Sequence, residues 1–123
     1  MTKRSRALEL YDGMREDLAA PQLALLRAGV RSHFEQLVRV QARDELVAVD
    51  LGELLCARLD GLLVGAHHFD VETRSSVVGA ARYFISSDDA VPDERSCTGL
   101  DDDVDVFNHV VREIGRFDLV ITE

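Results

Sequence analysis

Apolar residues recur at steps of three and four positions along most of this chain, which is the spacing of an amphipathic α-helix. The two prolines fit this pattern, because Pro21 stands where a helix can begin and Pro92 stands in a polar segment that turns. We therefore predict an all-α fold, a compact bundle of about five helices. Their predicted ranges are residues 5–18, 21–41, 44–64, 71–85 and 101 to a stop at Gly115.

Length and composition predict a single helical domain over residues 1–123. A chain of 123 residues that is 46% hydrophobic can bury one core and is too apolar to be disordered. Residues 65–70 are predicted as a connection and residues 86–99 as a polar loop. Residues 117–121 are apolar and β-branched, which predicts a short strand or an extended C-terminal tail that packs on the core.

The net charge of −9 limits the partners of the chain. An acidic surface repels a phosphate backbone, and the basic cluster at residues 3–6 is too short to offset it, so we predict no binding of nucleic acid. No apolar signal segment follows this cluster, and charged residues interrupt the longest apolar stretch, residues 46–65. We therefore predict a cytoplasmic protein, with Cys56 in the core and Cys97 in a loop.

The most distinctive part of the chain is an aspartate-rich segment, residues 88–105, between the last two predicted helices. Asp89 and Asp93 flank Pro92 and can accept backbone N–H bonds in a turn. Residues 101–103 fall at the start of the last helix, where the helix dipole stabilises a carboxylate. On this interpretation the aspartates join two helix ends through a polar turn.

From Tyr83 the chain reads YFISSDDAVPD, then five residues, then GLDDDVDVF. Over about residues 83–107 this pattern resembles the YkvA-like family, a small helical domain of uncharacterised function. The positions that match the family motif are Tyr83, Phe84, Ile85, Asp89, Pro92, Asp93, Gly99, Asp102, Asp103 and Val106. The resemblance implies a motif region at about residues 71–115, in which these residues build a helix junction.

The chain departs from the family pattern in the same segment. Ser87 replaces the usual first proline, Asp88 stands at a usually apolar position, and residues 94–98 are polar where the family is apolar. The apolar stretch of the family implies a peripheral membrane location, which the polar residues here disfavour. Asp88, Asp101 and Asp105 lie outside the shared motif, so we predict that they form a surface for a protein partner.

A divalent-cation site is the alternative interpretation of the aspartates. Hard cations take several oxygen ligands, and Asp89, Asp93, Asp102 and Asp103 would converge if the loop doubled back. Neighbouring aspartates repel one another, and a cation would relieve this repulsion. The spacing is not that of an EF-hand, because the required glycine and glutamate are missing.

Two further groups contain histidine. His67 and His68 precede an aspartate, an arrangement similar to an HD-type ligand pair, although a solvated connection explains it as well. Asp102, Asp105 and His109 are spaced to share one helix face. This face suits a zinc or manganese ligand set, or an exposed surface of mixed charge.

The sequence contains no G-x-S-x-G elbow, phosphate loop or dinucleotide fingerprint. Small size, negative charge and the lack of a catalytic pattern predict a non-catalytic acidic interaction or regulatory protein, such as an inhibitor, immunity or stress accessory factor of a bacterium. Its expected partner is a protein, preferably basic. A divalent-metal-binding protein or metal-dependent enzyme stays open as an alternative, and so does a peripheral membrane protein. A divalent cation is the one cofactor that the sequence suggests.

Overall fold

The computed structural model describes residues 3–41, 49–90 and 100–122 and confirms the all-α prediction. Within these residues there is no strand, and no helix is both long enough and apolar enough to cross a bilayer. The helices are α1 (Lys3–Met14), α2 (Ala20–Gln41), α3 (Val49–Val64), α4 (Val71–Ala90) and α5 (Asp101–Glu113). Two short 3-10 turns follow α3 and α5, namely η1 (Ala66–His68) and η3 (Phe117–Leu119).

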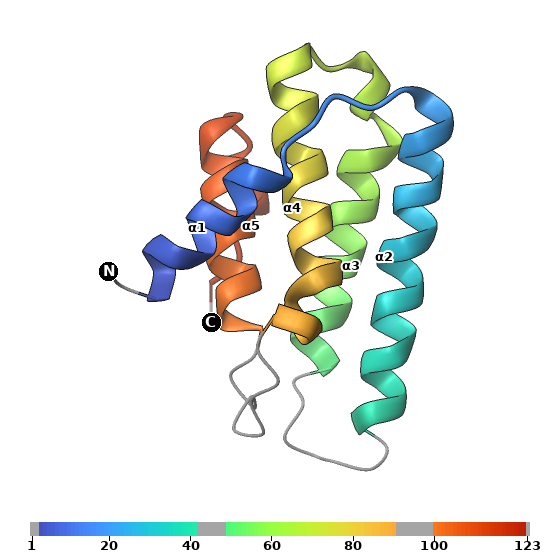
Figure 1. Cartoon of the computed structure of the whole chain (residues 1–123), viewed down its shortest axis with the longest axis vertical. Helices are drawn as coiled ribbons and strands as arrows, with labels where there is room; N and C mark the ends of the chain where they lie inside the picture. The colour runs from blue at the N-terminus through green and yellow to red at the C-terminus, as the bar shows by residue number, and fades with distance from the viewer. Residues whose placement is uncertain (1–2, 42–48, 91–99, 123) are drawn as a thin grey trace.

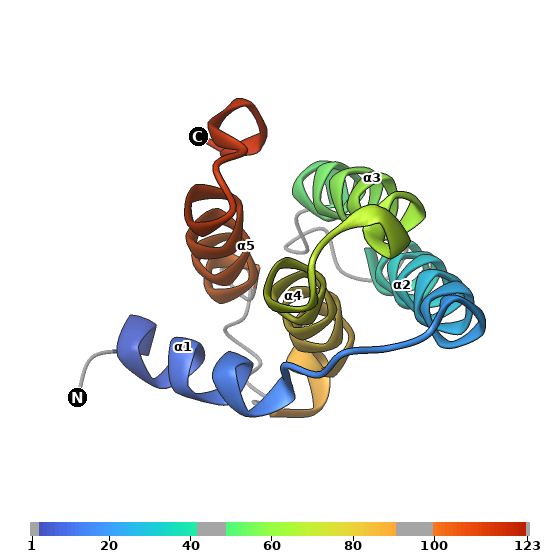
Figure 2. The same cartoon turned by 90° about the horizontal axis from the view of Figure 1, so that it is seen from above.

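Helix α4 is the centre of the bundle, and the other four helices all contact it. Figure 1 shows α2, α3, α4 and α5 running along the long axis of the molecule, and Figure 2 shows α1 lying across them. Because α4 has neighbours on several sides, it buries nearly every residue of its middle part instead of one stripe. These residues are Ser76, Val77, Val78, Gly79, Ala80, Ala81, Tyr83 and Phe84.

Two helix boundaries differ from the prediction. Helix α4 continues to Ala90, so the first five residues of the predicted loop 86–99 are helical. Residues 86–91 contain no glycine or proline, and polar side chains alone do not end a helix. The next helix breaker is Pro92, which disfavours helix at the residue before it. Helix α1 ends at Met14, four residues earlier than predicted. Residues 42–48, which include the predicted start of the third helix, lie outside the described residues.

Of the two forms predicted for residues 117–121, the structure contains a tail that packs on the core and no strand, and the tail begins with the 3-10 turn η3. Gly115 has a φ of 82°, the left-handed conformation that commonly follows a helix. After η3 the chain returns to α5, where the Ile121 N–H donates to Asn108 Oδ1 at 2.8 Å. Asn108 Nδ2 in turn donates to the Ile121 carbonyl at 3.0 Å. One buried amide side chain thus satisfies backbone groups that a sheet would otherwise pair.

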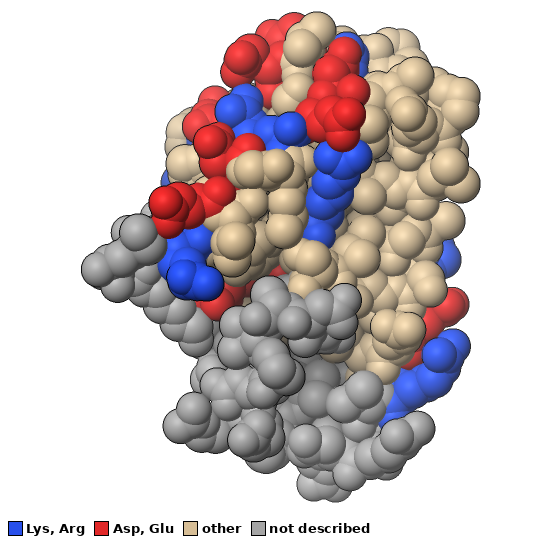
Figure 3. All heavy atoms as spheres, viewed as in Figure 1, with Lys and Arg blue, Asp and Glu red and all other residues tan. Residues whose placement is uncertain are grey.

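Helix α1 has few buried residues, and ion pairs hold the segment that follows it to α4. Of residues 6–14, only Ala7 and Tyr11 are buried. The Tyr11 ring lies directly on Gly79 of α4, where an added Cβ would come within 2.8 Å of the ring. Next to this contact, arginines pair with carboxylates between α4 and the segment that follows α1: Arg15 with Glu72, Arg82 with Glu16, and Arg74 with Asp17. Figure 3 shows acidic and basic side chains next to one another on the upper part of one face of the molecule.

Candidate functional site

The negative charge of the protein is concentrated in the aspartate-rich segment. Residues 88–105 contain eight acidic residues and one basic residue, a net charge of −7 out of −9 for the whole chain. The other 105 residues therefore carry a net charge of only −2. The described parts of the segment are the end of α4 and the start of α5, which lie near each other in the lower half of Figure 1. We call this end of the molecule the acidic junction.

Five arginines outside the acidic junction lie in ion pairs of their own. Three of them join α4 to the segment after α1. Arg27 of α2 binds Asp60 of α3, with its Nε 2.9 Å from Oδ1, and Arg116 pairs with Asp118 at 3.1 Å. Because each of these five arginines is paired with a carboxylate outside the acidic junction, their positive charges do not offset the charge of the junction.

A buried tyrosine lies where α4 meets the start of α5. Tyr83 is 6% exposed and Asp103 is 3% exposed, so the packing of the two helices encloses both side chains. Burial raises the pKa of the Tyr83 hydroxyl, and the charges of Asp102, Asp103 and Asp105 raise it further. The first turns of α5 therefore bring three carboxylates close to one neutral phenol.

The aspartates lie in the first turn of α5, where the sequence places them. The N-cap residue is Leu100, which makes no side-chain capping bond and packs into the core instead. Asp102 and Asp103 stand just inside the helix, near the positive end of its dipole, which favours ionised carboxylates. The helix start consequently holds negative charge in a rigid position on the bundle.

The structure brings together part of the predicted site. Tyr83, Asp102 and Asp103, predicted as junction residues, share one region with Asp105, which was predicted for the partner surface. Asp102 and Asp105 are partly exposed there. The acidic junction therefore combines the buried side chains of Tyr83 and Asp103 with two carboxylates that reach solvent.

The other predicted positions are only partly described. Asp88 and Asp89 belong to the last turn of α4, and Asp101 begins α5, but their side chains lie outside the described part of the structure. Pro92, Asp93 and Gly99 lie wholly outside it. Among the residues that the structure describes, no three histidine, cysteine, aspartate or glutamate side chains form a group that could hold a metal ion.

The histidine pair and the aspartate that follows it lie in η1 and just before α4. His67 and His68 form η1, with their rings 3.9 Å apart and exposed to solvent. The carboxylate of Asp70 accepts the Thr73 N–H at 2.8 Å at the start of α4, and hydrogen bonds from Thr73 lower its pKa. Asp70 therefore caps a helix.

His109 is directed toward α1 and the end of α5. Its ring lies edge-on to Tyr11 at 5.8 Å, and its Nε2 is 3.4 Å from Glu113. Asp102, Asp105 and His109, the predicted ligand set, do not come together as a metal-binding group, and the described residues contain no such group. Cys56, predicted to lie in the core, is partly buried and packs against the core, and burial raises the pKa of its thiol. Cys97 lies outside the described residues.

The comparisons with known proteins return no relative. No family model matches the chain, and neither a curated protein nor a solved structure matches it. The resemblance to the YkvA-like family stays a prediction, so the function has to be argued from the acidic junction itself.

Proposed function

We propose that this protein is a non-catalytic interaction or regulatory protein that binds a basic protein partner through the acidic junction. The observation that carries the proposal is the charge distribution: residues 88–105 hold −7 of the net charge, while five arginines elsewhere are paired locally. A local field of one sign accelerates encounter with an oppositely charged protein and selects against acidic partners. The inhibitor, immunity and stress accessory factors of the bacterial cytoplasm are the class of protein that works in this way.

The packing of α4 and α5 supports this proposal. A partner surface needs charged carboxylates that are held in fixed positions. The side chains of Tyr83 and Asp103 are buried, and the neighbouring Asp102 and Asp105 are partly exposed. On this view the residues that resemble the YkvA-like motif act as scaffold. Asp88, Asp101 and Asp105 supply the charge that the partner meets.

The test removes charge from the acidic junction and compares the loss with an equal removal elsewhere. The first variant carries Asp88→Asn, Asp101→Asn and Asp105→Asn. The matched control carries Glu9→Gln, Glu35→Gln and Glu53→Gln, three exposed positions on α1, α2 and α3. Both variants lower the net negative charge by the same amount, so only the location of the charge differs.

Binding to an arginine- and lysine-rich peptide is measured by calorimetry, and proteins captured from a bacterial lysate are quantified by mass spectrometry. We expect the junction variant to bind the peptide at least about tenfold more weakly, and the control to change by less than about twofold. The junction variant should also capture fewer basic proteins from the lysate than the control variant does. Equal losses in the two variants would overturn the proposal, because binding would then follow net charge alone.

A divalent cation at Asp89, Asp93, Asp102 and Asp103 is the second candidate. It is supported by Asp102 and Asp103, which both lie close to Tyr83 and whose mutual repulsion a cation would lower. Thermal melts of the intact chain with Mg²⁺, Ca²⁺, Mn²⁺, Zn²⁺ or chelator test it. A bound ion at a hundredfold excess over its dissociation constant stabilises the fold by about 2.7 kcal/mol. An unchanged melt with all four ions rejects this candidate and leaves the first intact.

A further inference from the structure

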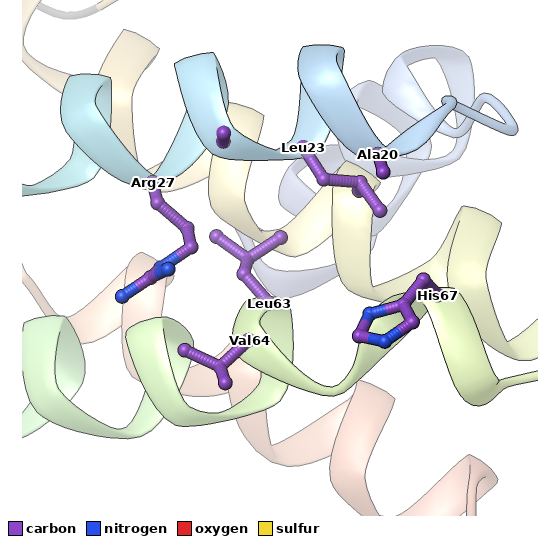
Figure 4. Close-up of a pocket in the computed structure, with 7 residues that line it drawn as sticks. Ala20, Leu23, Arg27, Leu63, Val64 and His67 are labelled. Carbon is purple, nitrogen blue, oxygen red and sulfur yellow. The ribbon is translucent and has the colours of Figure 1, made fainter.

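A small apolar hollow lies between the first turns of α2 and the last turns of α3, and Figure 4 shows the residues around it. Its floor is formed by Leu23 and Leu63, which are 3% and 1% exposed. The remaining lining residues are Ala20, Ala24, Arg27, Val64 and His67. We call it the α2–α3 hollow. Its volume of about 90 Å³ is not filled by any residue that the structure describes.

Gly79 of α4, by contrast, leaves a space that the chain itself fills. The Tyr11 ring and the Arg15 side chain lie where a side chain of residue 79 would stand, at 2.8 and 2.9 Å from an added Cβ. The Tyr11 ring is also edge-on to His109 of α5, with the ring centroids 5.8 Å apart, and the residue is 3% exposed. Gly79 and His109 thus hold one aromatic side chain between α4 and α5. We call this place the Tyr11 notch.

Helix α1 and the segment after it follow one face of α4 and one face of α5. Figure 2 shows α1 lying against both helices. On α5, Tyr11 lies near His109 and Glu113, which are four residues apart. Residues at steps of three and four share one side of a helix, and the positions of α4 that meet this segment have that spacing: Glu72, Ser76, Gly79, Arg82 and Ser86. We call the surface that α1 covers the α4–α5 face.

The α4–α5 face continues into the acidic junction. On α4, Tyr83 stands four residues after Gly79, and on α5, Asp105 and Asp102 stand four and seven residues before His109. These steps keep the residues on the same helix faces. The two partly exposed carboxylates therefore lie roughly 6 to 10 Å along α5 from the Tyr11 notch, which is close to the screening length of about 8 Å at physiological salt. A segment bound in the notch is within reach of the charge of the junction.

Helix α1 has the sign of charge that the acidic junction attracts. Residues 3–6, at the start of α1, contain three basic residues and no acidic one. The other 119 residues of the chain carry a net charge of −12. Helix α1 thus combines a basic first turn with an aromatic side chain that enters the notch. A basic helix of another protein could recognise the α4–α5 face through the same two features.

The attachment of α1 to this face is limited. Of residues 6–14, only two are buried. The side chains of Glu72 and Glu16, which pair with arginines beside α1, are 87% and 59% exposed, and ion pairs exposed to this degree contribute little to stability. Residues 15–19, which join α1 to α2, are not helical. Helix α1 can therefore leave the α4–α5 face while the other four helices stay packed.

We propose that α1 is an autoinhibitory segment, which covers the α4–α5 face and is displaced by a basic amphipathic helix of the partner whose aromatic side chain enters the Tyr11 notch. This inference rests on the proposed function, because it assigns the regulation of the acidic junction and the form of its basic partner. As part of the same chain, α1 has an effective concentration in the millimolar range. A partner helix displaces it by making more contacts with the carboxylates of the junction.

The first measurement needs no partner. Hydrogen exchange of the intact chain, followed by mass spectrometry, reports how often α1 opens. Tyr11→Ala empties the notch, and we expect the amides of residues 3–14 to exchange at least about tenfold faster while those of α3 change by less than about twofold. Leu10→Ala is the matched control, since it truncates a side chain of the same helix that is 40% exposed. If Tyr11→Ala accelerates exchange in α1 no more than Leu10→Ala does, the proposal is overturned.

A second variant loosens α1 without changing a buried residue, which keeps the test valid if Tyr11→Ala does not fold. Glu16→Gln with Glu72→Gln removes two exposed carboxylates that pair with Arg82 and Arg15, and α1 should exchange about two- to fivefold faster. The matched control, Glu35→Gln with Glu53→Gln, removes the same charge from exposed positions of α2 and α3. Equal acceleration by the two pairs would overturn the proposal, because charge alone would then explain it.

Binding is measured by calorimetry with a synthetic peptide of residues 3–14 of this chain, and with the same peptide carrying Tyr11→Ala. The unchanged peptide should bind the Tyr11→Ala chain at least about tenfold more tightly than the wild-type chain, because the notch of the wild type is occupied by its own α1. The substituted peptide should bind both chains equally weakly. Equal affinity of the unchanged peptide for the two chains contradicts the proposal.

The arginine- and lysine-rich peptide separates this inference from the proposed function. It should bind the Tyr11→Ala chain at least about threefold more tightly than wild type, because α1 no longer covers the face next to the junction. If it binds both chains equally and the junction variant more weakly, the proposed function stands and α1 is not autoinhibitory. If it binds neither chain, the proposed function fails and this inference fails with it.

Discussion

At one end of the bundle Asp102, Asp103 and Asp105 of the acidic junction lie close to the buried Tyr83, and at the other the α2–α3 hollow is lined mainly by alanine, leucine and valine. Both surfaces rest on the same helical core, in which α4 contacts each of the other helices. A charged surface attracts over a distance and weakens with salt, whereas an apolar surface acts at contact and does not. The charged surface for which we propose binding and the mainly apolar hollow lie about a helix length apart on this core.

The largest effect should come from the floor of the hollow. Leu63 is 1% exposed, so Leu63→Ala leaves a cavity and should cost about 2–5 kcal/mol of the free energy of unfolding. Leu25→Ala, at 74% exposure, should change this free energy by less than about 0.5 kcal/mol. Urea denaturation of both variants measures the difference. Similar losses at the two positions would contradict this difference in burial.

Salt should act on the charged end of the bundle and leave the apolar end unchanged. Between about 50 and 300 mM NaCl, we expect binding of the basic peptide to weaken roughly tenfold, because the charges of the acidic junction are screened. The stability lost in Leu63→Ala should stay the same over this range, since the burial of an apolar side chain does not depend on screening. Calorimetry and urea denaturation on one protein preparation check both. Peptide binding that does not respond to salt would contradict the comparison.

Gly61 offers a smaller, stabilising change beside the hollow. It lies within α3, is exposed, and has no heavy atom within 4 Å of an added Cβ. Gly61→Ala should therefore raise the free energy of unfolding by about 0.5–1 kcal/mol through reduced backbone entropy of the unfolded chain. Gly79→Ala is the contrasting variant, because its Cβ would meet the Tyr11 ring at 2.8 Å and should destabilise the fold. Thermal melts of the two variants should shift in opposite directions.

The smallest effect concerns the titration of Tyr83. Burial and the three aspartates raise its folded-state pKa above the unfolded value near 10, so the neutral phenol is favoured in the fold. The stability that this provides is complete below about pH 10 and is lost as pH rises toward the folded-state pKa. In Tyr11→Phe, Tyr83 is the only tyrosine left, and its absorbance at alkaline pH reports its ionisation.

A junction variant and a variant on α2 in this single-tyrosine background test the assignment. Asp105→Asn should lower the pKa of Tyr83, because one of the charges that raise it is removed. Leu25→Asp should leave the titration unchanged. A shift of the same size in both would mean that total charge, and not the local arrangement at the acidic junction, sets this pKa.

Much of the fold could be predicted from the sequence because helices follow from local spacing. The repeats at Leu23, Val30 and Leu37 predicted α2, and all three residues are buried. His33 was not predicted as buried, yet it is 5% exposed, with its ring 4.8 Å from that of Phe84. A histidine on an apolar face cannot be assigned from spacing alone, since its burial depends on which helix lies opposite.

The acidic junction was predictable only in part. The run of aspartates is visible in the sequence, and its placement at the start of α5 follows from the helix pattern. That Tyr83 and Asp103 are enclosed, while Asp102 and Asp105 reach solvent, depends on how α5 packs on α4. The α2–α3 hollow was not predicted, because its lining residues are ordinary apolar helix positions that the sequence does not distinguish from the core.

The sequence by itself determined the helical class, the approximate helix ranges and the position of the excess charge along the chain, because each depends on neighbours a few residues apart. Only the tertiary structure decided that α4 lies at the centre and that Arg15, Arg74 and Arg82 fasten the segment after α1. It also placed the acidic junction and the α2–α3 hollow at opposite ends. These features join residues more than 50 positions apart, and such contacts follow from how the apolar faces of five helices pack together.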